Sequence, residues 1–528
     1  MVPEEQARPS DSSPDLVVLS DLHLGEGRSR HPERFSPMEE FFYDESFARL
    51  LDHLQRRYAA DPSGLVLVLN GDVLDFLTIT RLPDPEPGFE MSSAERRFGL
   101  NPTPSKSIFK LDRIVQGHPA FFDALARFAA AGHRIEILRG NHDLEIFFEE
   151  VRERLVGQLV ERAGGDEAVR ARLRFHQWFY LEPGRVYIEH GNQYEASNSI
   201  RYPLRPLLPV GKRRGESEPV LDYPLGSLFV RYFYNGVHHI DPYTPKVVSF
   251  EHYLEFLRRY NLLDLLRIAR RHYPFFLQAL GPRSPSGSSG PCEQDEAEQR
   301  EAFESLDRAA EPRDLHAQLN ALKIMPLSAS KAGLVKEMTK PILRRLTWTA
   351  GVAFVSLYVW LLIFNVIQAT PFVAESVFVK AILLAVFSIA TMLVLLGLGN
   401  HLAHKLRRTT DRSVAVCAQQ AERIAELTGV KLVLMGHTHE VDIRRIAGGK
   451  ATYANSGTWT SVDNPWDRLH PDARRFTFLH VQGDEVQVRR WNDDAGRIDP
   501  VPLFDRSEES LPGPSSRSRL RRLRRPRR

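Results

Sequence analysis

Five short apolar segments recur along this chain, and each of them ends in a cluster of polar residues. The segments cover 16–19, 65–69, 135–138, 186–188 and 432–435. Apolar runs of this length, broken here only by Glu136 in the third segment, are typical of strands that are buried on both faces. Amphipathic stretches lie between several of them, for example over 39–57 and 120–131. Buried strands that alternate with helices predict an α/β domain.

The spacing of the segments indicates a large insertion. Residues 190 and 437 are separated by 246 residues, which is far more than one crossover between strands needs. After the fifth segment, two more apolar stretches at 476–479 and 486–488 flank the dipeptide Gly483-Asp484. This pattern predicts an antiparallel hairpin that closes the domain.

The polar clusters behind the five segments carry the chemistry. They are Asp21-Leu22-His23, Gly71-Asp72-Val73-Leu74-Asp75, Gly140-Asn141-His142-Asp143, His190-Gly191-Asn192 and Gly436-His437-Thr438-His439. Ligands of open α/β sheets bind at the carboxyl ends of the strands. The clusters offer carboxylate, amide and imidazole donors but no thiolate, a combination that suits Mn, Fe, Zn or Mg. One such cluster alone could be a solvated turn, whereas five in this order favour a shared metal site.

The number of donors is sufficient for two metal ions. Two cations that share one carboxylate need about seven or eight donor groups. The candidate ligands are Asp21, His23, Asp72, Asn141, His190, His437 and His439.

This set of motifs resembles the calcineurin-like metallophosphoesterase superfamily. The resemblance covers about half of the chain, over 15–197 and 413–492. The segments 20–25 and 453–459 are more narrowly similar to the branch that contains the UDP-2,3-diacylglucosamine diphosphatases. The chain departs from that branch in its long insert, in an apolar hairpin described below, and in His142, where many of those enzymes carry arginine.

The resemblance implies a fold, a ligand set and a reaction. The fold would be a two-sheet αββα sandwich. Asp21, His23 and His439 would hold one metal, Asn141, His190 and His437 the other, and Asp72 would bridge them. The implied activity is that of a phosphohydrolase, in which a hydroxide that bridges two divalent cations attacks a phosphoester or phosphoanhydride. Manganese is the first choice of metal, with iron, zinc or magnesium as alternatives.

Four further residues receive roles around these ligands. His142 would be catalytic, either by stabilising charge on the transferring group or by protonating the leaving oxygen. Asp75 or Asp143 would orient a histidine from outside the ligand set. Arg139 could meet a substrate phosphate, although a surface ion pair is the commoner fate of an arginine.

Two long apolar runs interrupt the α/β pattern. The segments 346–368 and 381–400 contain no formally charged residue, and each can cross a hydrocarbon core of about 30 Å as a helix. Lysines and arginines precede the first run and follow the second, so we predict a transmembrane hairpin over 346–400 with both ends in the cytoplasm. The alternative is a pair of buried core helices. Because a hairpin returns the chain to the same side, all five motifs can meet in one compartment.

The hairpin completes the predicted organisation of the chain. We expect a disordered N-terminus (1–14), the first part of the core (15–197), a helical insert (198–345) with a Pro/Ser/Gly linker near 282–289, the hairpin (346–400), the second part of the core (413–492) and a basic disordered tail (493–528). The insert is either a cap over the site or a helical subdomain with its own core.

Charge separates the tail from the rest of the chain. Eight of the last twelve residues are arginine, and without them the net charge changes from +3 to −5. Attraction to anionic lipid, a solvated end without a partner, and nucleic acid are the three interpretations, and nucleic acid is the least favoured.

The sequence thus predicts a multi-pass membrane protein whose catalytic domain faces the cytoplasm. Its substrate would be a phosphorylated small molecule or lipid, lipid-linked or nucleotide-linked, and both the hairpin and the tail at 517–528 would contact the membrane. The alternative function is a non-catalytic, membrane-anchored scaffold with the same fold. The sequence does not predict the oligomeric state.

Overall fold

The computed structural model describes most of the predicted core and parts of the insert and hairpin. The described residues are 13–28, 35–84, 88–208, 218–235, 314–327, 354–366, 376–406, 410–460 and 476–501, with a few single positions between 270 and 369. The predicted N-terminal segment to residue 12, the linker at 282–289 and the arginine-rich tail at 517–528 lie outside them.

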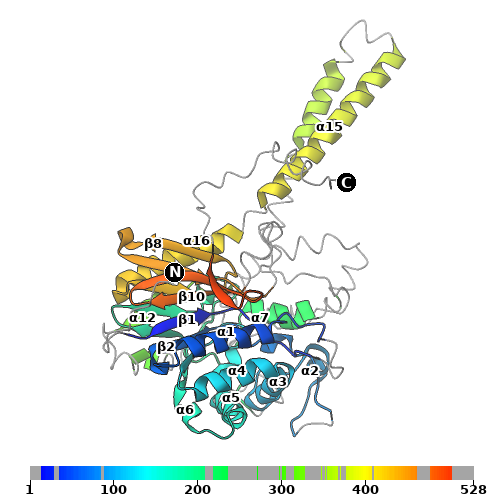
Figure 1. Cartoon of the computed structure of the whole chain (residues 1–528). Coiled ribbons are helices and arrows are strands. Elements are labelled where there is room, and N and C mark those ends of the chain that lie inside the picture. Colours follow the sequence, from blue (N-terminus) through cyan, green and yellow to red (C-terminus); the bar gives the residue numbers. More distant parts are fainter. Residues whose placement is uncertain are drawn as a thin grey trace, which may run out of the picture.

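Two β-sheets form the centre of the protein (Figure 1). The first has the order β12-β11-β10-β1-β2-β3-β4, and the second the order β5-β6-β7-β9-β8. The strands of the first sheet are β1 (Asp15–Leu19), β2 (Leu65–Asn70), β3 (Arg134–Leu138), β4 (Leu173–His176), β10 (Thr477–Gln482), β11 (Glu485–Asn492) and β12 (Arg497–Pro500). Those of the second are β5 (Phe179–Glu182), β6 (Val186–Glu189), β7 (Leu432–Met435), β8 (Val441–Ile446) and β9 (Ala451–Ser456).

Strand directions bring the polar clusters to one end of the molecule. Strands β1 to β4 are parallel to one another, and β10 to β12 continue the sheet in antiparallel order. In the second sheet β6, β7 and β9 are parallel, and β5 and β8 are antiparallel edge strands. The carboxyl ends of β1, β2 and β3 therefore lie on one edge of the first sheet, and those of β6 and β7 on one edge of the second.

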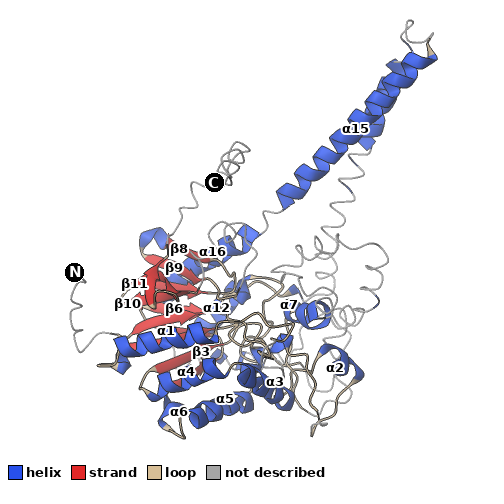
Figure 2. Cartoon of the chain, turned by 45° about the vertical axis from the view of Figure 1, so that its right-hand side comes forward, coloured by secondary structure: helices blue, strands red, loops and turns tan. Residues whose placement is uncertain are grey.

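Helices cover the outer faces of both sheets (Figure 2). The α-helices are α1 (Asp44–Arg57), α2 (Ser93–Phe98), α3 (Pro104–Gly117), α4 (Pro119–Ala130), α5 (Glu149–Arg162), α6 (Ala168–Arg172), α7 (Leu225–Phe229), α12 (Leu315–Leu322), α15 (Val377–Leu406) and α16 (Thr410–Thr428). Short 3₁₀ turns are η1 (Pro62–Gly64), η2 (Phe76–Thr78), η3 (Leu144–Phe147), η4 (Asn192–Tyr194) and η8 (Ala447–Gly449), and η5 (Val230–Tyr234) is a π-helical turn.

Alternation along the strands builds three apolar layers. In β1, Leu16 and Val18 face the second sheet, where they meet residues such as Ile188 and Leu434. The outward residues of the same strand pack under the helices, in one cluster with the aromatic side chains of α1 and α4. Helices α12 and α16 pack on the other outer face. Because a strand directs successive side chains to opposite faces, fully apolar strands need cover on both sides. The predicted α/β sandwich is confirmed.

All five predicted strands and the closing hairpin of β10 and β11 are present. The start of the predicted disordered tail is wrong, because β12 pairs with β11, with Ile498 opposite Trp491. Among the described insert residues, the helical prediction is correct over 225–235, in α12 and at the single positions 270, 297, 300, 301, 303 and 304. The segment 198–208 is irregular because Pro203 and Pro206 each lack a backbone N–H and disfavour helix in the residue before them.

Two helical segments extend away from the sheets in both views. One is α15, and the segment 354–366 lies beside it (Figures 1 and 2). Within the described residues, no helix combines the length and hydrophobicity that a membrane crossing requires. The predicted transmembrane hairpin is therefore not confirmed. Parts of it, including 348–350 and 370–375, lie outside the described residues.

Candidate metal centre

The seven predicted ligands lie at the strand ends, and all of them are buried except His439, which is partly exposed. Three overlapping groups of side chains have donor atoms within 4.8 Å of one another. The groups are Asp21 with His23 and His439, His23 with Asp72 and His142, and Asp72 with His190 and His437. The structure thus contains buried groups that can hold a metal ion. The seventh candidate, Asn141, has a buried Oδ1 without a hydrogen-bond partner.

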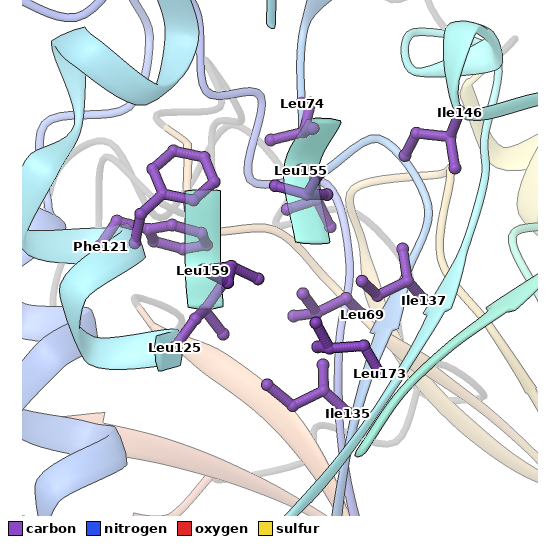
Figure 3. A pocket seen from close by; sticks show the side chains of 12 residues that line it. Leu69, Leu74, Phe121, Leu125, Ile135, Ile137, Ile146, Leu155, Leu159 and Leu173 are labelled. Carbon is purple, nitrogen blue, oxygen red and sulfur yellow. The ribbon is translucent and has the colours of Figure 1, made fainter. Parts of the chain in front are cut away.

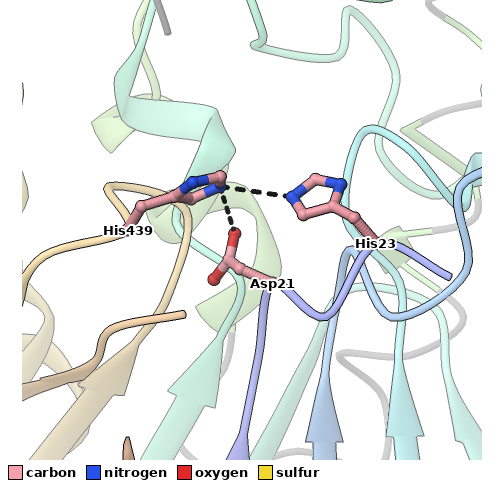
Figure 4. Close-up of side chains that lie close together, drawn as sticks. All are labelled: Asp21, His23 and His439. Atoms are coloured by element: carbon pink, nitrogen blue, oxygen red, sulfur yellow. Dashed lines mark hydrogen bonds and ion pairs between the residues drawn. The ribbon is translucent and has the colours of Figure 1, made fainter. Parts of the chain in front are cut away.

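The first group joins the loop after β1 to the loop after β7 (Figure 4). Nε2 of His439 lies 3.2 Å from Oδ1 of Asp21 and 3.2 Å from Nε2 of His23. Burial by itself raises the pKa of Asp21, but the nearby His439 and His190 outweigh the effect of burial. The pKa of Asp21 therefore lies well below its ordinary value. Three donor atoms at such separations match the spacing of ligands around a single cation, where each lies about 2 Å from the metal.

The third group, Asp72 with His190 and His437, is built around His190. Its Nδ1 donates to the carbonyl of Asn70 (3.0 Å), so Nε2 is directed toward Oδ2 of Asp72 at 3.1 Å. Burial lowers the pKa of His190, but Asp72 and Asp21 reverse that effect and raise it to about 10. A proton here balances buried negative charge, and a divalent cation can replace it.

Asp72 stands between the groups. Its Oδ2 faces His190, and its Oδ1 accepts the backbone N–H of His142 (2.8 Å). Burial would raise its pKa, yet the surrounding histidines hold the pKa well below its ordinary value. An ionised carboxylate that belongs to two donor groups occupies the position a bridging ligand needs.

The two carboxylates predicted to orient a histidine have different contacts. Oδ2 of Asp75 lies 3.1 Å from Nδ1 of His142 and 3.5 Å from Nδ1 of His23. Asp143 contacts backbone instead, because its carboxylate accepts the N–H groups of Gly140 (2.5 Å) and Val73 (2.9 Å). Burial, followed by the charge of Asp72, raises the pKa of Asp143 to about 7. Asp75 therefore orients imidazoles, while Asp143 closes the loop that carries Asn141.

The backbone of the site is strained. Five of the seven predicted ligands have positive φ, namely Asp21 (54°), His23 (54°), Asp72 (50°), His437 (69°) and His439 (58°). Non-glycine residues in this region cost about 1 to 3 kcal/mol each and persist where the surroundings impose them. They cluster at functional sites more than elsewhere. This strain is an indication of function that is independent of side-chain chemistry.

Glycine permits the close approach of the loops. A Cβ on Gly140 would lie closer than 3.0 Å to the Asp72 carboxylate, and one on Gly436 equally close to Ser20 and Asp21. The glycines in the Gly-Asn-His-Asp and Gly-His-Thr-His motifs are thus required by packing between loops.

The segment after β9 supports the first group. The Thr458 hydroxyl donates to the carbonyl of Asp21 (2.6 Å), and the Asn455 amide donates to the carbonyl of Gly436 (2.6 Å). The Ser20 hydroxyl contacts both Asp21 and Ser456. Asn455, Ser456 and Thr458 belong to the segment 453–459, and Ser20 to the segment 20–25. Both segments carried the narrower resemblance in the sequence, although no role was predicted for these four residues.

Glu195 was missed by sequence reasoning. Its Oε2 accepts a hydrogen bond from Nε2 of His437 (2.7 Å), across 242 positions of the chain. Burial raises its pKa, but hydrogen bonds from His437, Ser197 and Asn198 outweigh that and lower it. It belongs to no motif, and only its place five residues after His190 could have drawn attention to it.

Arg139 is buried and does not lie on the surface. It is 4% exposed, donates to the carbonyl of Pro203 and lies 5.4 Å from the centre of the Phe147 ring. Burial lowers its pKa to about 9. The expectation of a surface ion pair was wrong, because this side chain fastens the start of the insert to the core.

An apolar cavity lies apart from these polar groups. It has a volume of about 20 Å³ and lies between the first sheet and helices α4 and α5, with Leu69, Leu125 and Leu159 in its wall (Figure 3). A space of this size holds about one water molecule, and a wall of hydrocarbon gives such a water no hydrogen-bond partner. It is a packing defect of the core.

No protein-family model and no curated protein matches this chain.

Proposed function

We propose that this protein is a metal-dependent phosphohydrolase of the calcineurin-like metallophosphoesterase type. The observation that carries the proposal is the convergence of carboxylate and imidazole side chains from five strand ends in two sheets. Five of the predicted ligands also have strained backbone with positive φ. Asp21, His23 and His439 would hold one divalent cation, Asn141, His190 and His437 a second, and Asp72 both. The unpartnered Oδ1 of Asn141 and the crowded imidazoles of His23 and His439 fit such ions.

Two such cations would supply the charge that neutralises phosphoryl oxygens and activates a water molecule. The chain's own contribution beyond the ligands is His142. Asp75 faces its Nδ1 and so fixes the orientation of the ring, and the ring of His23 packs edge-on against it at 4.6 Å between centres. In this position His142 would stabilise charge on the phosphoryl group or protonate the leaving oxygen.

We further propose that the protein resides at a membrane, with the metal centre on the cytoplasmic side. Support comes from the apolar side chains that the two extended helical segments expose, among them Phe354 (71%), Val377 (84%) and Phe378 (75%). Contiguous apolar surface on this scale requires cover by lipid or by a partner. The favoured substrate is therefore a lipid-linked phosphoester or phosphoanhydride, and a nucleotide-linked one is the alternative.

The test is a hydrolysis assay on the full chain, purified in detergent with Mn²⁺. An aryl phosphate ester, lipid-linked pyrophosphates, nucleoside diphosphates and simple phosphodiesters are compared side by side, with Asp72→Asn as the matched inactive control. We expect turnover of at least one class that is lost on chelation and in the variant. Bound metal without any turnover would favour the non-catalytic scaffold.

A further inference from the structure

Two side chains outside the ligand set touch residues that are proposed to hold the second cation: Glu195, just before the insert, and Ser227, within it. Glu195 contacts His437, and Ser227 contacts the backbone of Asn141. Both of these partners are proposed ligands of the same cation. The loop of Glu195 and helix α7 therefore both lie beside the second proposed metal site.

The carboxylate of Glu195 is fixed from several directions. Besides His437, it accepts hydrogen bonds from the hydroxyl of Ser197 (2.6 Å) and the amide of Asn198 (3.0 Å). Its backbone carbonyl accepts the N–H groups of Asn198 (3.0 Å) and Ser199 (2.8 Å). The loop therefore holds this carboxylate at a set position before any metal binds.

The contact determines how His437 can bind a metal. An ionised carboxylate only accepts hydrogen bonds, so Nε2 of His437 must carry the proton that it donates to Glu195. The lone pair of the imidazole then lies on Nδ1. The ring of His437 stands 5.3 Å from that of His190, centre to centre, within the same donor group. A histidine ligand whose second nitrogen donates to a carboxylate is oriented and made a stronger ligand.

The same segment reaches the other side of that site. The fully buried Ser227 hydroxyl, in the middle of α7, donates to the carbonyl of Asn141 (2.8 Å). The N–H of Gly226 donates to the carbonyl of Ser197 (2.8 Å), which joins α7 to the loop of Glu195.

Residues just before the predicted hairpin brace this loop from outside. The N–H of Ile324 donates to the carbonyl of Gln193 (2.9 Å), and that of Leu327 to the carbonyl of Ala196 (2.8 Å). Lys323 donates through Nζ to the carbonyl of Ile200 (3.0 Å). The loop is thus held between α7 and the segment 323–327.

We propose that Glu195 is a positioning residue that presents Nδ1 of His437 to the second cation, so that the loop after β6 completes one metal site of the pair. This inference rests on the proposed function. The first site has separate supports, since Asp75 lies beside His23 and Thr458 holds the backbone of Asp21. Loss of Glu195 is therefore selective for the second cation.

Metal titration of the full chain in detergent tests this selectivity. Mn²⁺ is added to metal-free protein, bound metal is counted after dialysis, and the electron paramagnetic resonance signal distinguishes isolated from coupled Mn²⁺. The wild type takes up two ions. Glu195→Ala takes up the first ion with unchanged affinity and the second about 10- to 100-fold more weakly, as removal of such a carboxylate generally causes. Glu195→Gln, which keeps an acceptor oxygen, lies between them.

Glu218→Ala is the matched control, because Glu218 is an insert carboxylate that accepts from Ser105 (2.7 Å) on α3 rather than from a ligand loop. It should bind two ions as the wild type does.

Equal second-site affinity in wild type and in both Glu195 variants would overturn the role of Glu195 while leaving the proposed function intact. A wild type that binds no Mn²⁺ would overturn both. Should Glu195→Ala fail to fold, Glu195→Gln alone decides, since unchanged second-site affinity in it contradicts the inference.

Discussion

At the scale of single residues, the site contains buried charged side chains whose backbone has strained, positive φ angles. Asp21 and Asp72 are almost fully buried, and both owe their ionised form to neighbouring histidines. Side chains in such a setting are costly to keep unless they serve a purpose. The roles of individual residues can be separated by substitution because the contacts of each differ.

Asp72→Asn should disable both metal sites. The amide keeps the size of the side chain. It removes the negative charge that faces His190 and that Asp72 also supplies to its donor group with His23 and His142. Metal analysis should find both ions lost, and hydrolysis should fall by at least about 100-fold. Normal metal content with normal turnover would refute the bridging role.

His142→Ala should retain both ions and lose most turnover, by about 10²- to 10⁴-fold, as expected for a general acid or a charge-stabilising group. Paired metal analysis and kinetics measure this. His142 also belongs to a donor group with His23 and Asp72. An emptied site in the variant would therefore show that His142 is a ligand.

At the scale of elements, the loops behind the strands depend on close packing against one another. Gly140→Ala would drive a methyl group into the Asp72 carboxylate. We expect loss of bound metal and a lower free energy of unfolding, measured by metal analysis and urea titration. Gly157→Ala is the control, because it lies within α5 with no atom near its Cβ position and should stabilise the protein by about 0.5 to 1 kcal/mol. Equal metal retention in the two variants would contradict this account.

The junction of α3 and α4 supports the loop after β1 through a buried histidine. Nδ1 of His118 contacts Asp44 (2.9 Å), and Nε2 contacts Glu39 (3.3 Å). Glu39 in turn accepts the N–H groups of Gly25 (3.2 Å) and Gly27 (2.5 Å). Burial lowers the pKa of His118, but the hydrogen bonds to Asp44 and Glu39 prevail and raise it to about 9.

A raised histidine pKa makes this contribution to stability depend on pH. It is fully present below the unfolded-state value of about 6.5 and is lost as the pH rises through about 9. His118→Gln should therefore lower the free energy of unfolding by about 1 to 3 kcal/mol at pH 6 and by much less at pH 10. Urea titrations of both proteins at the two pH values measure the difference. If the difference in the free energy of unfolding between the wild type and His118→Gln stays constant or increases with pH, His118 is not charged in the folded protein.

The strands differ in how well the sequence predicts them, and the reason is burial. Strands β1, β2, β3, β6 and β7 are covered on both faces, so apolar residues dominate both of their faces, although β3 also buries Glu136. Edge strands such as β8 and β12 carry Arg444 or Asp499 on a partly exposed face and have no such signal. The motif residues could be predicted because they end buried strands. Glu195 could not, because its contact with His437 exists only after β6 and β7, which are far apart in the sequence, have paired within the second sheet.

At the scale of the whole molecule, the ligands come from both ends of a long insertion, and the helical segments 354–366 and α15 extend from the body (Figure 1). Within the body, the segment 323–327 contacts the loop of Glu195. The proposed membrane contact and the proposed metal centre can therefore be tested separately on one chain.

Membrane attachment should depend on the extended segments. Replacing both Phe354 and Phe378 by glutamate places charge in the surface assigned to lipid, where each charge costs about 2.5 to 3.5 kcal/mol at the centre of a bilayer. Flotation with phospholipid vesicles should show that the variant no longer floats. Phe42→Glu is the control, since Phe42 is also exposed (46%) but precedes α1 on the body. Equal flotation of the double variant and the wild type would contradict the membrane assignment.

The most direct test of the central claim is to count bound Mn²⁺ and measure phosphoester hydrolysis in the same preparation of the full chain. The account predicts two ions per chain, hydrolysis that is abolished by chelation and restored by Mn²⁺, and loss of both properties in Asp72→Asn. A wild-type chain that binds two ions and hydrolyses none of the phosphate compounds tested would contradict it.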